Sequence, residues 1–531
     1  MRNKIIGLLF LVMSVLLIVA CSSKSNDDSK ADDSSEGGET ETGTETGGEL
    51  KIAVSAQPPS LDAHISSSSA SLDIGRMIFE TLMTLNEDHQ SVPMLAESIE
   101  ESEDGKTYTF KLREGIKFHN GEEMIAEDVE ASMNRWLENS PRALLLLDHA
   151  NFEAKDKYVV ELTLEKRVSD VLDIMAGQGQ FAAIMPKEQI DTATPEGVSE
   201  IIGTGPFKYE DWRQDQYVHL VKFDDYQSRD EEPSGYAGRK EALVDDLYYY
   251  FVPDSSTRVA GLQTGEYDIA EQIPQDSYER LEEMDGVQTH VYYFGTLNMF
   301  YNKKEGIMSD PKMRQAVNIA LNMDEIMLAS YANENLFKVD HNYMNPDSVG
   351  WASDAGKDFY NQNDIEKAKE LLAESGYNGE KVRLLTTRDY DDYYSAAVVV
   401  QEQLEQIGMN VDLEVFDLAT LYDNRAEPDR WEMFFGGVGY NTSPSQLLAI
   451  NPTYPGWTED PRITELLAEM GASTSQEEAK QHWDELHEFL WAEYLPASIL
   501  GHYTNIIAVS DKVENLTIFQ ATVPWNTRKA K

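Results

Sequence analysis

Side chains that could do covalent or metal chemistry are sparse in this 531-residue chain, which has one cysteine and ten histidines. The closest histidines, His482 and His487, are five residues apart, a spacing that does not place both on one helical face. Gly203-Thr204-Gly205 is followed by Pro206, which favours a tight turn over a nucleotide loop. The patterns G-x-x-x-x-G-K-[ST], G-x-S-x-G and H-E-x-x-H do not occur. The sequence therefore predicts a protein that is not an enzyme, with no metal site and no cofactor.

The single cysteine, Cys21, stands in an informative setting. Arg2 and Lys4 precede an apolar stretch over 5–20 that ends in Ala20. This stretch is shorter than the about 20 residues of a membrane span and is typical of a signal peptide. The arrangement resembles a bacterial lipoprotein signal, in which the cysteine thiol is diacylated and cleavage makes it the new N-terminus. We therefore expect a signal peptide over 1–20 and a lipid anchor on Cys21, although an ordinary signal with an incidental cysteine is the alternative.

Charge and composition divide the rest of the chain. The segment 22–48 is mostly Ser, Asp, Glu, Thr and Gly, which predicts that 21–48 is the lipidated cysteine plus a disordered acidic tether. The formal net charge of −51 argues against nucleic acid as a partner, and limits membrane contact to the lipid. Hydrophobic residues make up 41% of the chain, enough for large buried cores in two or three domains.

Alternating and helical patterns beyond residue 49 predict the elements of an α/β protein. Strands are expected over 50–54, 107–113, 158–164, 244–252, 382–385, 410–416 and 431–437. Helices are expected over 126–136, before Gly265, over 364–376 with Asp364 as N-cap, over 395–407, and from Ser475 onward.

Several segments occur in a fixed order along the chain: SLD at 60–62, PMLAES at 93–98, GKTYTFKLREGIKFHNGEEMIAEDV at 105–129, IGTGPFK at 202–208, GEYDI at 265–269 and SDPKMRQA at 309–316. With the helix over 364–376 and Tyr377, they resemble the family-5 solute-binding proteins of ABC importers, which include oligopeptide, dipeptide and nickel receptors. The resemblance covers 49–531.

The resemblance implies an α/β fold of the periplasmic-binding-protein type, with two discontinuous lobes and an additional inserted domain. Lobe I would comprise 49–79, 200–295 and 500–531, the inserted domain 80–199, and lobe II 296–499. A ligand would lie in the cleft between the lobes and be enclosed by hinge closure.

Within that fold, the segment after the strand over 431–437 aligns with the ligand-contacting strand of the peptide receptors. Its candidate contacts are Gly437, Val438, Gly439, Tyr440 and Asn441. The glycines would allow either a close approach of ligand to backbone or a close internal contact. Peptide receptors of the family carry an aspartate that pairs with the ligand's α-ammonium group at the position of Tyr440 or Asn441. Its absence predicts weaker dependence on that ammonium group.

The remaining candidates are six side chains in other segments. Arg388, with neighbouring Tyr390, could clamp a ligand carboxylate, or form a surface pair with Asp389 or Asp391. Arg142 aligns loosely with an arginine of the nickel receptor's site, and we favour a surface position for it. Gln57, Phe294 and Thr296 lie where other cleft walls are expected, although simple core packing is the favoured role of Phe294.

Together, these features predict a lipid-anchored receptor on the outer face of a bacterial cell membrane. It would capture peptides as a monomer and deliver them to the permease of an ABC importer whose ATPase is a separate subunit. A receptor for a non-peptide solute, such as a nickel chelate or an oligosaccharide, is the alternative within the family. A surface lipoprotein hydrolase and an adhesive lipoprotein are the alternatives from other classes.

Overall fold

The computed structural model describes residues 47–179 and 181–530. The expected signal peptide, Cys21 and the tether up to residue 46 lie outside the described residues. The last two residues of the expected tether belong to the folded body. The Gly47 N–H donates to the Leu243 carbonyl at 2.7 Å, and the Gly48 N–H donates to Asp245 Oδ2 at 2.9 Å.

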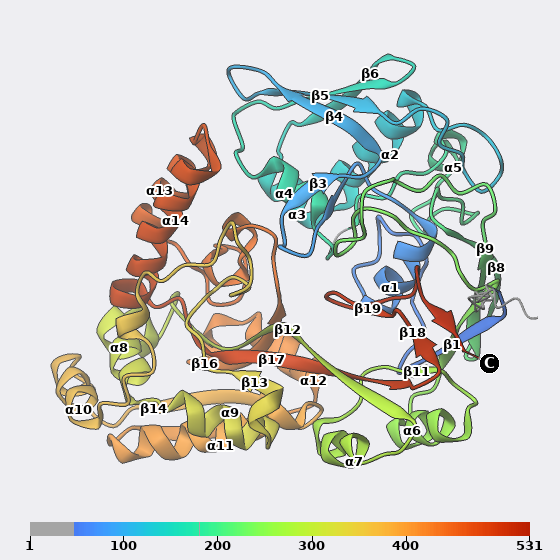
Figure 1. Ribbon diagram of the computed structural model, residues 1–531. Coiled ribbons are helices and arrows are strands. Elements are labelled where there is room, and N and C mark those ends of the chain that lie inside the picture. The colour runs from blue at the N-terminus through green and yellow to red at the C-terminus, as the bar shows by residue number, and fades with distance from the viewer. Residues whose placement is uncertain (1–46, 180, 531) are drawn as a thin grey trace, which may run out of the picture. The chain divides into compact units, whose positions relative to one another are not determined.

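The largest element of the fold is a mixed sheet of eleven strands, in the order β15-β14-β16-β12-β17-β11-β1-β10-β9-β8, with β13 paired to β17 (Figure 1). The strands are β1 Glu49–Val54, β8 Phe207–Arg213, β9 Tyr217–Lys222, β10 Asp246–Phe251, β11 Ile269–Ala270, β12 Val287–Tyr301, β13 Phe337–Lys338, β14 Lys381–Thr387, β15 Asn410–Phe416, β16 Met433–Gly439 and β17 Ala497–Ser510.

Two long strands, β12 and β17, join the two ends of this sheet. They pair antiparallel from Val287↔Ser510 to Phe300↔Ala497, with irregularities next to Gly295 and Asn298. The expected lobe boundaries at 295/296 and 499/500 therefore fall inside these continuous strands, which Figure 1 shows side by side. Any division into lobes I and II at this place cuts through strands rather than loops.

The segment expected as an inserted domain contains its own four-stranded antiparallel sheet, in the order β4-β5-β7-β6. The strands of this sheet are β4 Ala96–Glu101, β5 Thr107–Leu112, β6 Asn151–Asp156 and β7 Val159–Thr163. The same segment contains β2 Met83–Leu85 and β3 Ser91–Pro93, which pair with each other. Its helices are α2 Ala126–Asn139, α3 Pro141–Leu146, α4 Val171–Ala176 and α5 Lys187–Asp191, and α1 Ser69–Ile78 precedes it.

Most of the remaining helices begin after a residue whose side chain accepts a backbone N–H group of the first turn. The remaining helices are α6 Ser255–Thr264, α7 Tyr278–Glu282, α8 Pro311–Ala320, α9 Met323–Tyr331, α10 Ile365–Glu374, α11 Asp391–Gln406, α12 Leu418–Arg425, α13 Pro461–Ala472 and α14 Gln476–Phe489. Asp364 and Ser475 cap α10 and α14 as expected, by accepting the N–H groups of Lys367 at 3.0 Å and Glu478 at 3.2 Å. No helix within 47–179 and 181–530 combines the length and apolar character needed to cross a bilayer.

Two hydrophobic cores support these layers. One contains β1, α1, β9 and β10 together with the expected inserted domain, so this domain shares its core with part of lobe I. The other contains lobe II and also Val259, Leu262 and Leu281, which we expected in lobe I. Four short strands complete the C-terminal region: β18 Val513–Glu514, β19 Thr517–Ile518, β20 Thr522–Val523 and β21 Arg528–Lys529.

Candidate ligand-binding site

The predicted site segments follow the carboxyl ends of parallel strands. β1 and β11 run parallel, with Ile52 opposite Ile269, and lead to Gln57 and Glu271. β14 and β16 also run parallel, and lead to Arg388 and to Tyr440. Open α/β sheets bind ligands outside the carboxyl ends of their strands, because the loops there are free to vary. This is the edge on which a ligand site is expected.

The pairing of β12 with β16 brings seven of the predicted site residues together. Gly295 lies opposite Gly439 and Thr296 opposite Val438, so Phe294 and Thr296 adjoin the segment 437–441. The Tyr440 N–H donates to the Phe294 carbonyl at 3.3 Å. A recess between them, lined by Thr296, Val438, Gly439, Tyr440 and Asn441 among others, holds only about 10 Å³. The recess is thus nearly filled by the protein's own side chains.

The glycines of this region make room for other parts of the protein. A Cβ atom on Gly437 would lie 2.6 Å from Tyr393 Oη, the atom to which the Gly437 N–H donates. A Cβ on Gly295 would lie 2.1 Å from the Val438 carbonyl oxygen. Of the two interpretations of the glycines, the structure favours close internal contact at Gly437.

We expect Gly295→Ala to lower the free energy of unfolding by about 1–3 kcal/mol, because its Cβ would displace backbone of β16. Gly439→Ala is the matched control, since it is the ladder partner of Gly295 and its Cβ would have 3.8 Å of clearance. Urea denaturation of both variants measures the difference. Equal stabilities of the two variants would contradict the steric explanation.

A row of aromatic rings runs along this edge. The Tyr292 and Phe294 centroids are 6.5 Å apart, the Phe294 and Tyr503 centroids 5.9 Å, and Tyr503 stacks on Tyr331 at 6.2 Å. Tyr393 extends the row, because its hydroxyl accepts the Gly437 N–H and the Tyr503 hydroxyl lies against the same glycine. Phe294 is only partly buried, so the simple core packing that the sequence favours for it is not what the structure shows. Tyrosine rings with polar tips suit contact with peptide backbones and apolar side chains.

Tyr440 is held by a buried histidine. Its hydroxyl lies 2.8 Å from His502 Nδ1, and burial lowers the pKa of His502 to about 4. The imidazole is therefore neutral near pH 7 and serves as a hydrogen-bonding partner rather than a charge. Next to Tyr440, Asn441 Oδ1 is buried and has no hydrogen-bond partner among the described residues.

Arg388 and Tyr390 lie at the exposed end of β14. The Arg388 guanidinium lies 4.3 Å over the Tyr394 ring and donates to Tyr394 Oη at 2.7 Å, instead of pairing with Asp389 or Asp391. Tyr390 connects to the aromatic row, with its ring centroid 5.0 Å from that of Tyr393. Arg388 is thus held by an aromatic side chain rather than by either aspartate.

Arg142 is not the surface side chain that we favoured. It lies on α3, is partly buried against Gly179, and donates from Nη1 to Gln446 Oε1 at 2.9 Å. Burial lowers the pKa of its guanidinium. Gln446 belongs to the loop after β16, so Arg142 connects the expected inserted domain to the loop that carries predicted site residues.

Further contacts tie the same loop to α4. The Thr442 hydroxyl donates to the Asp173 carbonyl at 2.7 Å, and the Ser445 hydroxyl donates to Asp170 Oδ2 at 2.5 Å. Trp351 Nε1 donates to Asp173 Oδ2 at 3.0 Å. The expected inserted domain and lobe II are therefore in direct polar contact in this structure.

Gln57 lies apart from these residues and borders a second recess. Its side chain bonds to Asp215 through Nε2 at 3.2 Å and accepts the Asp215 N–H at 3.0 Å. It lines a cavity of about 290 Å³ together with Asp73, Glu271 and others. Sequence reasoning missed both acids, although Glu271 follows the GEYDI segment at the end of a short strand, a position that could have identified it.

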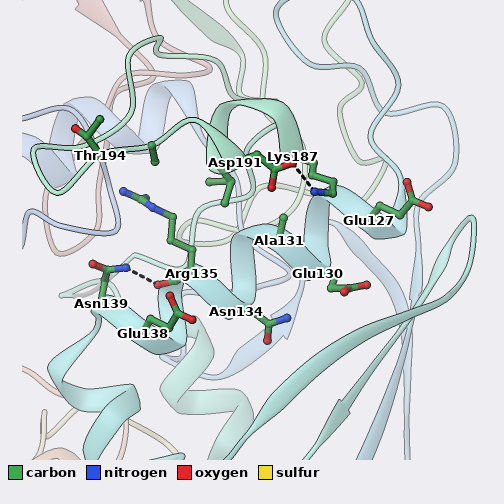
Figure 2. A pocket seen from close by; sticks show the side chains of 12 residues that line it. Glu127, Glu130, Ala131, Asn134, Arg135, Glu138, Asn139, Lys187, Asp191 and Thr194 are labelled. Atoms are coloured by element: carbon green, nitrogen blue, oxygen red, sulfur yellow. Dashed lines mark hydrogen bonds and ion pairs between the residues drawn. The ribbon is translucent and has the colours of Figure 1, made fainter.

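A larger hollow of about 620 Å³ lies on α2 and α5 and is lined by none of the predicted site residues (Figure 2). Its acids are Glu127, Glu130, Glu138 and Asp191, of which Asp191 pairs with Lys187 in the same lining at 2.5 Å. Arg135 borders it, but the Arg135 guanidinium is bonded to Asp62. Among the described residues no cluster of three or more His, Cys, Asp or Glu could hold a metal ion. We assign no ligand to this surface.

The fold and this strand edge define a class, the two-lobed periplasmic binding proteins. The profile of the bacterial extracellular solute-binding proteins, family 5, matches residues 90–459, and the chain belongs to this family. It is a solute-binding protein rather than an enzyme.

Three relatives illustrate the similarity. The probable peptide ABC transporter periplasmic-binding protein y4tO of Sinorhizobium fredii is 28% identical over 85% of this chain and 88% of its own. The binding protein AgaA of A. tumefaciens R10, solved with agropinic acid, has a TM-score of 0.74 and 25% identity, over 91% and 99% of the two chains. The oligopeptide-binding protein AppA of Bacillus subtilis, solved with a nonapeptide, has a TM-score of 0.72 and 23% identity, over 92% and 100%.

Proposed function

We propose that this protein captures peptides in the cleft between its lobes and delivers them to the permease of an ABC importer. The observation that carries the proposal is family membership together with the similarity to y4tO, which is described as a peptide-transport protein. The aromatic row from Tyr292 to Tyr393 supports it, since such rings accommodate varied side chains without demanding one. Residues Phe294, Thr296 and 437–441 would form one wall of the cleft.

Native mass spectrometry of freshly purified protein tests this proposal. We expect co-purified masses that match peptides, and we expect synthetic peptides of the same composition to bind saturably in isothermal titration. Ligand should also raise the melting temperature, because it binds the folded state and stabilises it by mass action. It should reduce the radius of gyration, because the lobes close around it. A preparation that binds no peptide in either measurement would contradict the proposal. Intact peptide after prolonged incubation distinguishes a receptor from a hydrolase.

A non-peptide solute is the second candidate. AgaA, whose fold is similar, was solved with agropinic acid. A nickel chelate or an oligosaccharide belongs to the same alternative. The same mass-spectrometric measurement separates these cases, because each class of solute has its own mass signature.

We further propose that Cys21 anchors the protein to the outer face of the cell membrane by its lipid. The support is the sequence alone: the short apolar stretch, Ala20 and the acidic segment that follows. Cys21→Ser should move the protein out of the detergent phase in Triton X-114 partitioning. Unchanged partitioning of the variant would contradict the anchor.

The contact between Asp173 and lobe II predicts that binding depends on pH. Burial raises the pKa of Asp173 to about 6, whereas an exposed aspartate titrates near 3.8. Opening that separates Asp173 from lobe II would expose its carboxyl group and return its pKa toward 3.8, so closing would take up a proton. Closing would then become easier as pH falls through about 6, and this advantage would be lost above it. We expect Asp173 to tighten peptide binding about fourfold between about pH 7.5 and about pH 5.5.

Asp173→Asn should remove this contribution, and Asp191→Asn, which changes an exposed acid, should keep it. Identical pH profiles of all three proteins by titration calorimetry would contradict the assignment.

A further inference from the structure

The cavity of about 290 Å³ lies where β1, β11 and α1 meet. Its walls are the loop after β1, the first turns of α1, and the residues that follow β11. Two acids, Asp73 and Glu271, contribute to this lining, whereas no lysine, arginine or histidine among the described residues does. Ligand pockets start at about 300 Å³, so this cavity suits one side chain or head group rather than a whole peptide.

The two acids differ in their partners. Asp73 Oδ1 forms an ion pair with Arg76 Nη1, so its charge is compensated within the protein. Glu271 is only 5% exposed, and its Oε1 atom is buried without a hydrogen-bond partner among the described residues. Thr522 Oγ1 is also buried, and no hydrogen-bond partner of ordinary geometry lies near it among the described residues. Its hydroxyl is nevertheless close enough to Glu271 to lower the pKa of that carboxyl group against the effect of burial.

The neighbouring cation does not satisfy the Glu271 carboxyl group. Arg258 donates from Nε to the backbone carbonyl of Glu271 at 3.0 Å, and from Nη2 to that of Gln272 at 2.7 Å. Its Nη1 donates to the carbonyls of Val252 and Pro253 at 2.6 and 3.0 Å. The guanidinium thus holds the strand ends together through carbonyl oxygens, and its donors are directed to the backbone rather than to the side chain.

An uncompensated buried carboxyl group is unfavourable, and the protein responds by holding its proton. Burial, and then the charge of Asp73, raise the pKa of Glu271 to about 8. The group is therefore mostly protonated near pH 7. A cation in the cavity would favour the charged carboxylate and supply the missing hydrogen-bond donor. Strongly shifted acids in a concave site are typical of functional residues.

We propose that this cavity binds an ammonium or guanidinium group of the transported solute, with the Glu271 carboxylate as its counter-charge. The proposal rests on the proposed function and names the chemistry of the solute group. Glu271 lies in the expected lobe I. Tyr440 and Asn441, which occupy the position of the aspartate that peptide receptors of the family carry, lie in the expected lobe II. Tyr292, the first ring of the aromatic row, packs against the hydrophobic core that contains β1, α1 and β10, the elements that surround this cavity.

Isothermal titration with three related probes tests the proposal: the peptide Ala-Lys-Ala-Ala, its N-acetylated form, and the same peptide with norleucine in place of lysine. Each is titrated into wild type, Glu271→Gln and Glu266→Gln. Glu266 is an exposed acid five residues earlier that does not line the cavity, so its variant makes the same chemical change nearby without touching the cavity. Glu271→Gln keeps the size of the side chain and removes a buried acid, so it should fold as well as wild type by thermal unfolding.

We expect Glu271→Gln to weaken Ala-Lys-Ala-Ala at least tenfold and Glu266→Gln to weaken it less than twofold. A loss in wild type with the norleucine peptide identifies the side-chain ammonium as the bound group. A loss with the acetylated peptide identifies the α-ammonium. Affinities of Glu271→Gln within twofold of wild type for all probes would overturn the proposal.

A probe that is not a peptide separates this inference from the proposed function. Butylammonium chloride should raise the melting temperature of wild type and Glu266→Gln by about 1 °C or more and leave Glu271→Gln unchanged, whereas butanol should stabilise none of them. If no peptide binds but butylammonium does so through Glu271, the peptide function fails and the cation site stands. If butylammonium gives no shift that depends on Glu271, and peptide binding is equally indifferent to it, the cation site fails.

Discussion

Replacing Arg135 by alanine is expected to lower the free energy of unfolding by about 3–5 kcal/mol, because it strands a buried carboxylate. Asp62 is 1% exposed and Arg135 is 9% exposed. The guanidinium binds the carboxylate bidentately, with Nη1–Oδ1 at 3.0 Å and Nη2–Oδ2 at 2.6 Å. The same carboxylate accepts the N–H groups of His64 at 3.0 Å and Val198 at 2.9 Å. It thereby connects the loop after β1, α2 and the segment that follows α5.

The pH dependence of stability gives a second test of this pair. Burial alone would raise the pKa of Asp62, but the hydrogen bonds and charge of Arg135 outweigh it and hold the pKa below 3.8. The stability that this pair contributes is therefore complete above about pH 4 and is lost as pH falls through the lowered pKa. In Arg135→Ala the buried carboxylate loses its partner, so the defect relative to wild type should shrink as pH falls and the group is protonated.

Urea denaturation at about pH 7 and about pH 4 measures both effects. Arg213→Ala is the matched control, because Arg213 pairs with Asp211 at 3.2 Å on the exposed surface and should matter by less than about 1 kcal/mol. A defect of Arg135→Ala no larger than that of the control would show that the buried pair is dispensable. A defect that grows in acid would contradict the explanation by a stranded carboxylate.

Arg314→Ala is expected to cost about 3–5 kcal/mol for a different reason, the loss of donors to buried carbonyl groups. Arg314 on α8 is 1% exposed and forms no ion pair with any carboxylate in the part of the chain that the structure describes. Its guanidinium donates to the carbonyls of Met308 at 2.7 Å, Tyr494 at 2.6 Å and Leu495 at 3.0 Å. Each buried carbonyl left without a donor costs about 1–3 kcal/mol, and the removed side chain leaves a cavity.

Two further variants separate these causes. Arg314→Lys keeps a charge but cannot reach three carbonyls with a planar fork, so it should recover only part of the loss. Lys312→Ala is the matched control on the same helix, since Lys312 pairs with Glu374 at 3.2 Å in an exposed position and should change stability by less than about 1 kcal/mol. Full recovery of stability by Arg314→Lys would refute the role of the fork geometry.

Neither Arg135→Ala, which removes the partner of Asp62, nor Arg314→Ala should change which solute binds. Asp62 and Arg314 lie in the SLD and SDPKMRQA segments on which the family resemblance depends. Their contacts are internal, so these segments mark the family because they build the fold, and not because they touch a ligand.

Local interactions explain what could be predicted about the elements. The strand over 410–416 alternates in sequence and matches β15, and Asp364 and Ser475 cap helices where their positions indicated. In each case the decisive contacts lie within a few residues. The strand expected over 431–437 lies at 433–439 instead, and the helix expected over 395–407 begins at Asp391. Element ends depend on neighbours that the pattern does not contain.

The long strands β12 and β17 were not predicted. Residues 287–301 carry no clean alternation, because along much of their length the strand is buried on both faces. Their partners lie about two hundred residues further along the chain, with Val287 opposite Ser510. A pairing at that separation is decided by the packing of the whole sheet, which local periodicity does not encode.

The sequence by itself determined the family, the α/β class, the absence of familiar catalytic motifs and the unusual acidity, since all of these are properties of residue order or composition. Only the tertiary structure decided which charges are compensated. Arg135 meets Asp62 from 73 positions away, whereas Glu271 is enclosed with no hydrogen-bond partner for its Oε1 atom within 47–179 and 181–530. The energy of a charged group depends on its burial and its neighbours in space, and both arise only when distant segments pack together.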